Sequence, residues 1–319
     1  MGYNIFVTVP IPQPALDRLA PHCDCLDVGT VGDDRIALIR QVQRRDGVLC
    51  TLGQRIDAEV FDAAGPGCRV FSNFGVGTDH LDLSAAAERG IVVTNTPGVL
   101  TDATADLTWA LLLATARRAV EGDRMVRRGA WTGWHPLQFL GADVTGRALG
   151  IIGPGRIGSA VARRSAGFDM QVLYVGRADC PELNRIGAVR VDLETCLSQS
   201  DFVSLHVPLN ATTHHLIGPA QLALMKPSAI LINTARGPVV DQDALIQALQ
   251  SGLIAGAGLD VYDDEPVIPP ALAGLDNVIC LPHLGSATRA TRRKMGEMAV
   301  DNLLAVLSGQ APLHPVAAP

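Results

Sequence analysis

The sequence predicts an α/β protein whose parallel sheets are covered by helices on both faces. Short apolar runs alternate with amphipathic stretches along nearly all of the 319 residues, and this strand–helix–strand order is typical of parallel sheets. Some runs, such as 230–232, are apolar at every position, as strands buried on both faces can be. At roughly 100–200 residues per domain, the length indicates about two domains.

The expected strands are short apolar runs between turn residues or helical patterns. In chain order they cover 4–9, 47–51, 70–73, 92–95, 148–152, 171–175, 202–207, 229–234, 257–261 and 278–281. Helices are expected between them, among others over 14–20, 56–64, 83–89, 101–118, 157–168, 242–251 and 290–307.

Composition excludes several classes of protein. Hydrophobic residues make up 48% of the chain, which is enough to bury a large core and excludes general disorder. The 26 basic and 32 acidic residues give a net charge of −6 without a basic tract, so no nucleic-acid partner is predicted. Mean hydropathy is +0.23, but no apolar run approaches the roughly 20 residues that span a bilayer. No membrane partner is therefore predicted.

The N-terminus and the cysteines predict a cytoplasmic protein without a metal. The first residues enter an apolar run with neither a basic segment nor a long apolar segment of the kind that signal peptides have. The seven cysteines form no CxxC pair. Free thiols in a reducing compartment are therefore favoured over the alternative, a zinc site.

The segment 101–141 departs from the alternating pattern. A long helical pattern over 101–118 is followed by a loop-like stretch that contains Trp131 and Trp134. Large apolar side chains gathered in an exposed loop are unusual and indicate an interaction site. This loop is therefore expected to pack either against a second subunit or into a pocket of its own chain.

A glycine-rich loop between an expected strand and an expected helix predicts a dinucleotide site. Gly153, Gly155 and Gly158 have the GxGxxG spacing. The first glycine permits a tight turn, the second a close approach to pyrophosphate, and the third close packing of helix on strand. The helix N-terminus would then direct its amides at the phosphates. Pro154 has no N–H, so one donor is lost at that position. The alternative is a glycine turn without a ligand.

The residues after the next strand favour NADP over NAD. An acidic residue at this position accepts a hydrogen bond from the ribose 2′-hydroxyl in NAD-binding proteins. Here the position is occupied by Gly176, and Arg177 follows. A 2′-phosphate is favoured at this position, because no carboxylate repels it and a guanidinium can bind it. Asp179 is a later carboxylate that argues against this, and Arg177 as a solvated surface charge is the alternative.

Three later stretches bring an Arg, a Glu and a His to the ends of expected strands. Arg236, Glu265 and His283 each follow an apolar run, and the carboxyl ends of parallel strands meet at one edge. His can protonate a carbonyl oxygen as a hydride arrives, and a neighbouring Glu would hold the imidazole in place. Arg can bind a carboxylate and polarise the adjacent carbonyl. Taken singly, each also has a structural interpretation: a helix cap, a solvated charge or part of an acidic surface run.

Taken together, these motifs resemble the D-isomer-specific 2-hydroxyacid dehydrogenases, and within that family the glyoxylate/hydroxypyruvate reductases. The resemblance covers nearly the whole chain. It rests on 153–158, 233–237, 258–261 with 265–266, and 282–286; 94–106, 134–136 with Gly141, and 176–177 support the narrower assignment.

The resemblance implies a role for each matching residue. His283 would be the general acid/base, Glu265 its partner, and Arg236 the group that binds and polarises the substrate. The substrate would contact Leu52, Gly53, Val76, Gly77, Arg236 and His283, with the backbone N–H groups of residues 76 and 77 facing its carboxylate. The cofactor would contact Thr104, Gly153, Pro154, Gly155, Arg156, Ile157, Gly158, Gly176, Arg177, Val207, Pro208, Thr234, Ala235, Asp260 and Gly285.

The resemblance also implies the architecture and the activity. A Rossmann cofactor domain, 98–287, would be inserted in a flavodoxin-like substrate domain made of 1–97 and 288–319, and the chain would form a homodimer through 101–140. The expected activity is NADPH-preferring reduction of small 2-oxo acids such as glyoxylate and hydroxypyruvate, with NADH as an alternative cofactor. Two other readings stay open: another dehydrogenase on this scaffold, acting on phosphite or D-lactate, or a cofactor-sensing binding protein without turnover.

Overall fold

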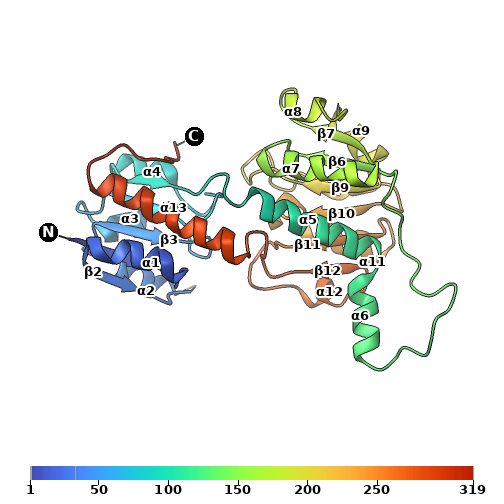
Figure 1. The fold of residues 1–319 in the computed structure, drawn as a ribbon, viewed down its shortest axis with the longest axis horizontal. Helices are drawn as coiled ribbons and strands as arrows, with labels where there is room; N and C mark the ends of the chain where they lie inside the picture. Colours follow the sequence, from blue (N-terminus) through green and yellow to red (C-terminus); the bar gives the residue numbers. More distant parts are fainter. Residues whose placement is uncertain (1, 33, 319) are drawn as a thin grey trace. The chain divides into compact units, whose positions relative to one another are not determined.

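The computed structural model describes residues 2–32 and 34–318, which form two α/β units. One unit comprises Met1–Leu100 and Ala287–Pro319, and the other comprises Thr101–Ser286. Each unit contains one parallel sheet with helices packed on it (Figure 1). The expected fold class, two doubly wound parallel sheets, is confirmed. The assignment of 1–97 with 288–319 to a substrate domain and of 98–287 to a cofactor domain stays a prediction.

The first unit contains a five-stranded sheet in the order β2-β1-β3-β4-β5, which is the flavodoxin-like order. Its strands are β1 (Tyr3–Val7), β2 (Cys23–Val28), β3 (Gly47–Cys50), β4 (Val70–Asn73) and β5 (Val92–Thr94). Its helices are α1 (Gln13–Leu19), η1 (Ala20–His22), α2 (Arg35–Gln41), α3 (Ala58–Ala64), α4 (Leu83–Glu88) and α13 (Arg289–Leu307).

The C-terminal helix α13 completes the core of the first unit. The hydroxyl of Ser72 in β4 donates to the carbonyl of Ala299 in α13 at 2.7 Å. A Cβ atom at Gly47 in β3 would lie 3.2 Å from Leu303, so the helix packs closely on the strand where this side chain is missing. These contacts join the end of the chain to the strands of its beginning.

The second unit contains a seven-stranded sheet in the order β12-β11-β10-β9-β6-β7-β8. Its strands are β6 (Ala148–Ile152), β7 (Gln171–Val175), β8 (Val189–Arg190), β9 (Phe202–Leu205), β10 (Ile230–Asn233), β11 (Gly256–Leu259) and β12 (Val278–Cys280). Its helices are α5 (Thr101–Ala116), α6 (Ala119–Arg127), α7 (Arg156–Arg164), η2 (Ser165–Phe168), α8 (Pro181–Asn184), α9 (Leu193–Gln199), α10 (Pro219–Leu224), η3 (Gly237–Val239), α11 (Gln242–Gln250) and α12 (Pro270–Ala273). The order reverses between β6 and β9, as in a Rossmann sheet.

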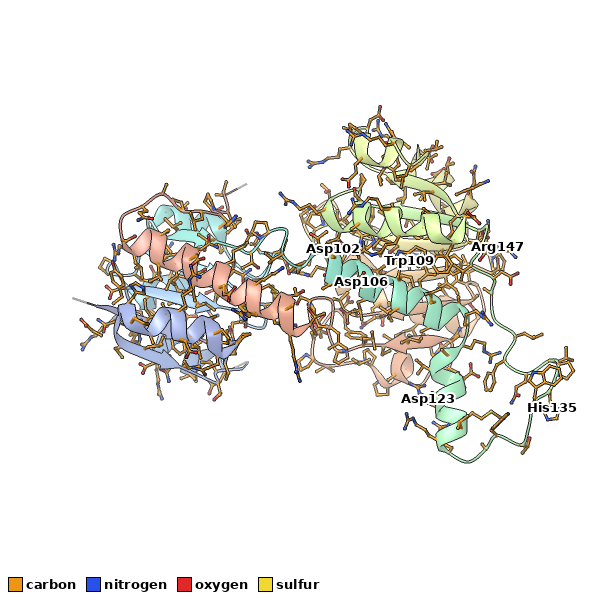
Figure 2. All side chains as sticks on the ribbon, viewed as in Figure 1. Asp102, Asp106, Trp109, Asp123, His135 and Arg147 are labelled. Atoms are coloured by element: carbon orange, nitrogen blue, oxygen red, sulfur yellow. The ribbon has the colours of Figure 1, made fainter. Side chains whose placement is uncertain are left out.

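Helices α5 and α7 are fixed to each other on one face of this sheet. The indole N–H of Trp109 donates to the carbonyl of Val161 at 2.9 Å. Arg164 of α7 pairs with Asp102 and Asp106, which lie one turn apart on α5 (Figure 2). These contacts hold α7, and with it the glycine loop that precedes it, against the sheet.

Several expected elements have different limits in the structure. The helix expected over 101–118 ends at Ala116, and Arg118 takes a left-handed conformation (φ 51°) before α6 begins. The helix expected over 157–168 divides into α7 and the 3-10 turn η2. Strands β2 and β8 were not expected; Asp24 and Asp27 interrupt the apolar residues of β2, and β8 has only two residues.

The tryptophan loop after α6 does not pack into a pocket of its own chain. Trp131 is 55% exposed and Trp134 78% exposed. In Figure 2 the label of His135 marks this loop, which extends from α6 away from the sheet. The intrachain alternative is therefore wrong. Within residues 2–32 and 34–318, helices that combine the length and the apolar character needed to cross a bilayer are absent.

Candidate active site

The carboxyl ends of the second unit's strands carry most of the predicted site residues. Gly153 follows β6, Gly176 follows β7, Thr234 follows β10, Asp260 follows β11, and the loop with His283 follows β12. In an open parallel sheet, ligands bind outside these ends where the strand order reverses. The topology thus brings segments that are more than 100 residues apart to one edge.

The three glycines of the loop each have a steric reason. Gly153 has φ +99°, and a Cβ there would lie 2.6 Å from the carbonyl oxygen of His206. A Cβ at Gly158 would overlap the carbonyl oxygen of Gly153, whereas a Cβ at Gly155 would meet open space. None of the described side chains caps α7, which starts at Arg156. The open space at Gly155 before an uncapped helix N-terminus is what a pyrophosphate needs, so these residues fit a dinucleotide.

The segment after β7 places Gly176 and Arg177 beside the glycine loop. The ring of Pro154 packs against Gly176. Arg177 is exposed, so a ligand at this edge could reach its guanidinium. Asp179 is paired at 3.4 Å with Arg190, which is not among the residues expected at the site.

Arg190 also holds the backbone of this segment. Its guanidinium donates to the carbonyls of Gly176 and Arg177, both at 3.1 Å. It lies in the edge strand β8, which is parallel to β7. No sequence motif identifies Arg190, because its role depends on the pairing of a strand too short to be recognised.

The loop after β9 contains Val207 and Pro208. Val207 is half-buried and Pro208 is exposed, and Thr213 donates to the carbonyl of Pro208 at 2.6 Å. This bond fixes the loop next to the glycine turn, where His206 closes over Gly153.

The turn after β10 orients Arg236 through its own backbone. Asn233 donates from its side-chain amide to the carbonyl of Arg236 at 2.8 Å and accepts from the amide of Ala235 at 3.0 Å. The Arg236 guanidinium donates to the Ala235 carbonyl at 2.8 Å. Thr234 shares a 2.9 Å hydrogen bond with Thr108 of α5, and both are buried. The Arg236 side chain is thus presented from a fixed turn.

Glu265 and His283 form a direct pair. The Nδ1 atom of His283 lies 2.7 Å from Oε2 of Glu265. The other carboxylate oxygen, Oε1, accepts from the amide of Tyr262 at 3.0 Å. Both side chains are about one-third exposed, so solvent or a ligand can reach them. With Nδ1 held by the carboxylate, Nε2 is the ring nitrogen available for proton transfer.

Glu265 is ionised under ordinary conditions. Burial opposes its charge, but the hydrogen bond and charge of His283, the Tyr262 amide and the charge of Arg236 outweigh it, so the pKa of Glu265 is lowered. Gly237, the residue after Arg236, lies against the backbone of Tyr262, whose amide donates to Glu265. The turn that carries Arg236 is therefore next to the segment that carries Glu265.

Asp260 anchors the loop that carries the histidine. Its carboxylate oxygens accept from the amides of Leu284 at 2.6 Å and Gly285 at 2.7 Å, and its carbonyl accepts from the amide of His283. Burial raises its pKa, although these amides oppose the shift. Thr104 of α5 is buried against Gly285. Asp260 thereby fixes His283 in a left-handed conformation (φ 54°).

Gly237 permits the close approach of the Arg236 turn to the Glu265 segment. A Cβ at Gly237 would overlap the carbonyl group of Tyr262, which directs its amide to Glu265. Gly237 lies within the motif used in the sequence analysis, but its steric role is evident only from the tertiary contact.

Replacement of Gly237 by alanine is expected to lower the free energy of unfolding by about 3 kcal/mol, because two backbones must separate. Urea denaturation measures this loss. Gly167→Ala is the control: its Cβ meets open space, and a change within about 0.5 kcal/mol is expected. Equal denaturation midpoints for the two variants would contradict the steric argument.

The predicted substrate residues of the first unit lie at the ends of β3 and β4. Leu52 packs against Gly75: a Cβ atom at Gly75 would lie 3.0 Å from Cδ2 of Leu52. Asn73 donates to the carbonyl of Gly77 at 2.8 Å, and Asn95 donates to that of Val76 at 2.9 Å. These bonds fix the 75–77 turn. Gly53, next to Leu52, is exposed.

Comparison with known proteins places these features in a family. Residues 109–285 match the model described as "D-isomer specific 2-hydroxyacid dehydrogenase, NAD binding domain". A glyoxylate reductase from Thermococcus onnurineus is 47% identical over 98% of this chain and 95% of its own length.

Two solved structures are similar over the same extent. The TT0316 protein from Thermus thermophilus has a TM-score of 0.93 at 48% identity, covering 98% of this chain and 100% of its own. An NADPH-dependent glyoxylate/hydroxypyruvate reductase from Sinorhizobium meliloti, in complex with NADP and malonate, has a TM-score of 0.88 at 37% identity, covering 99% and 97%.

Proposed function

Because the chain belongs to the D-isomer-specific 2-hydroxyacid dehydrogenase family, whose members are NAD(P)-dependent enzymes, we propose that it reduces glyoxylate and hydroxypyruvate with a preference for NADPH. The observation that carries this proposal is the Glu265–His283 pair, with the turn of Arg236 packed against the segment that carries Glu265. Similarity to glyoxylate reductases over nearly the whole chain supports the substrate class. Residues 98–287 would form the cofactor domain, and 1–97 with 288–319 the substrate domain.

The chain's own residues would bind the substrate and supply the proton. A reduced nicotinamide, when bound, supplies the hydride. Arg236 would bind the substrate carboxylate and polarise the neighbouring carbonyl. His283 would donate a proton from Nε2 to the carbonyl oxygen, and Glu265, through Nδ1, would stabilise the imidazolium beforehand. The backbone N–H groups of Val76 and Gly77 would bind the carboxylate as well.

The geometry of the second unit supports a proposal for the contacts of the cofactor. The pyrophosphate would lie at Gly155 and the N-terminal amides of α7, with Val207 and Pro208 at the adenosine end. Thr104, Thr234, Ala235, Asp260 and Gly285 would line the nicotinamide end. Arg177 would bind the 2′-phosphate, since Gly176 offers no carboxylate there and Asp179 is paired with Arg190.

Replacement of Arg177 by alanine is expected to raise the KM for NADPH roughly tenfold to a hundredfold and to change that for NADH little, because a charge-assisted hydrogen bond is worth about 1.5–3 kcal/mol. Initial rates with each cofactor at saturating glyoxylate measure the two values. Arg185→Ala, another exposed arginine, is the control. An equal rise for NADPH and NADH would refute the 2′-phosphate assignment.

An initial-rate matrix of 2-oxo acids against NADPH and NADH tests the proposed activity. We expect the highest kcat/KM for glyoxylate or hydroxypyruvate with NADPH. Higher values for oxidation of D-lactate or phosphite would favour another dehydrogenase of the same scaffold. Cofactor binding without turnover of any substrate would favour the sensing protein, which has no need of an acid/base pair.

We further propose a homodimer through α6 and the tryptophan loop, 128–141. Four large apolar side chains are exposed there: Trp131, Trp134, Leu137 and Leu140. Such a patch is unusual on a monomer and typical of an interface. Light scattering should give twice the chain's mass of 33.6 kDa, and Trp134→Asp should reduce that value. A monomeric wild-type protein would contradict the interface.

A cytoplasmic location remains a proposal that rests on the thiols. All seven cysteines are free, as is usual where the environment is reducing. Fractionation of cells with an antibody to the chain would test it, and recovery of the protein outside the cytoplasm would overturn it.

A further inference from the structure

Pro154 leaves no room for a side chain at Gly176, the position after β7 where NAD-binding proteins carry an acidic residue. A Cβ at Gly176 would lie 2.6 Å from Cγ and 2.9 Å from Cδ of the proline ring, closer than Cβ atoms come to other heavy atoms. The φ angle of Gly176 lies outside the left-handed region, so its backbone would accept any residue. The obstacle to a side chain at this position is therefore the ring, not backbone strain.

The proline side of this contact is held in place. The pyrrolidine ring fixes φ of Pro154, and its carbonyl accepts from the hydroxyl of Ser159 in α7 at 3.2 Å. The preceding residue, Gly153, donates to the carbonyl of Val175 at 3.0 Å. The ring is thus tied both to the helix and to the strand that leads to Gly176.

The glycine side is held as well. Arg190 donates to the carbonyls of Gly176 and Arg177, both at 3.1 Å, so the segment cannot retreat from the ring without losing both bonds. The same guanidinium lies 3.4 Å from Asp179, an exposed carboxylate of this segment.

We propose that Pro154 is a specificity-determining residue that acts through Gly176. Its ring excludes an acidic side chain from the position that would recognise a 2′-hydroxyl and repel a 2′-phosphate. Pro154 is in this sense a positioning residue of the glycine loop, beyond the loss of one N–H donor. The inference rests on the proposed preference for NADPH, which it explains by a steric coupling of two positions.

A double-mutant cycle tests this coupling. The full-length wild-type, Pro154→Ala, Gly176→Asp and Pro154→Ala/Gly176→Asp proteins are titrated with NAD⁺ and NADP⁺ by isothermal calorimetry, with thermal melting as a check on folding. Alanine lacks Cγ and Cδ, the two atoms in close contact. Gly167→Asp, where a Cβ meets open space, is the control for an added charge.

We expect Gly176→Asp alone to weaken both dinucleotides about tenfold or more, because the loop must shift. The double variant should bind NAD⁺ at least about tenfold more tightly than Gly176→Asp does, after any change that Pro154→Ala causes in the wild-type protein is subtracted. That excess is a coupling of about 1.4 kcal/mol. The ratio of the two Kd values should also reverse in the double variant. Pro154→Ala alone restores an N–H that would serve both dinucleotides alike, so its ratio should stay within about threefold of wild type.

Equal NAD⁺ affinity for Gly176→Asp and the double variant would overturn the inference. If Gly176→Asp does not fold, Gly176→Ala replaces it: NADP⁺ affinity and melting temperature should fall in that variant and recover with Pro154→Ala, and failure to recover would overturn the inference as well. A wild-type protein that binds NAD⁺ more tightly than NADP⁺ would refute the proposed cofactor preference, whereas the coupling between positions 154 and 176 decides this inference in either case.

Discussion

Replacement of His283 by alanine is expected to lower kcat for glyoxylate reduction by about 10²–10⁴-fold, because no other group would protonate the carbonyl oxygen. Its Nδ1 is held by Glu265 at 2.7 Å, which leaves Nε2 for the substrate. Cofactor affinity should change little, since the glycine loop and Arg177 are untouched. Steady-state rates and dinucleotide titration separate the two effects.

Two further variants sharpen this prediction. Glu265→Gln keeps a hydrogen-bonding group of similar size but removes the charge that favours the imidazolium, so a smaller loss, about tenfold to a hundredfold, is expected. His22→Ala, an exposed histidine of the first unit, should retain wild-type kcat. Near-normal turnover by His283→Ala would remove the role assigned to this residue.

Replacement of Arg236 by alanine is expected to lower kcat/KM by about 10²–10³-fold, with kcat falling and KM rising together. The guanidinium would bind the carboxylate in the ground state and stabilise charge on the carbonyl oxygen in the transition state. The loss should be measured at several substrate concentrations, so that both parameters are defined.

Arg236→Lys is the informative companion. Lysine keeps the charge but cannot form a bidentate pair with a carboxylate, so partial recovery of kcat/KM is expected. In Arg236→Ala the pKa of Glu265 should also rise, because the charge of Arg236 contributes to lowering it. A rise in KM at unchanged kcat in Arg236→Ala would limit the residue to substrate binding and contradict the polarising role.

Much of the fold could be predicted from local patterns. Buried parallel strands such as β10 are apolar throughout, so their existence is evident from sequence, and their limits differ from expectation by one or two residues. Strand β2 was missed because Asp24 and Asp27 interrupt its apolar run, and β8 because two residues carry no periodicity. Helices α5 and α6 are separated at Arg118, whose backbone takes a left-handed conformation. No glycine or proline stands at this position to indicate the break from sequence.

Candidate site residues could be proposed from the sequence where a motif carries its own chemistry. Gly153, Arg236, Glu265 and His283 were selected because residue type and position after a strand point to one edge of a sheet. Arg190 was not, because its role depends on tertiary contacts that leave no local pattern. The same holds for the steric roles of Gly237 and Pro154, which depend on what a neighbouring backbone or side chain occupies.

A single-turnover experiment tests the central claim most directly, namely that Arg236, Glu265 and His283 carry out proton-coupled reduction of a small 2-oxo acid. Enzyme in excess over NADPH is mixed with glyoxylate, and the absorbance of the reduced nicotinamide is followed together with the formation of glycolate. The account predicts loss of the absorbance with one glycolate formed per NADPH, and a rate lowered about 10²–10⁴-fold in His283→Ala. Bound NADPH whose absorbance stays unchanged with glyoxylate, or equal rates in the two proteins, would contradict it.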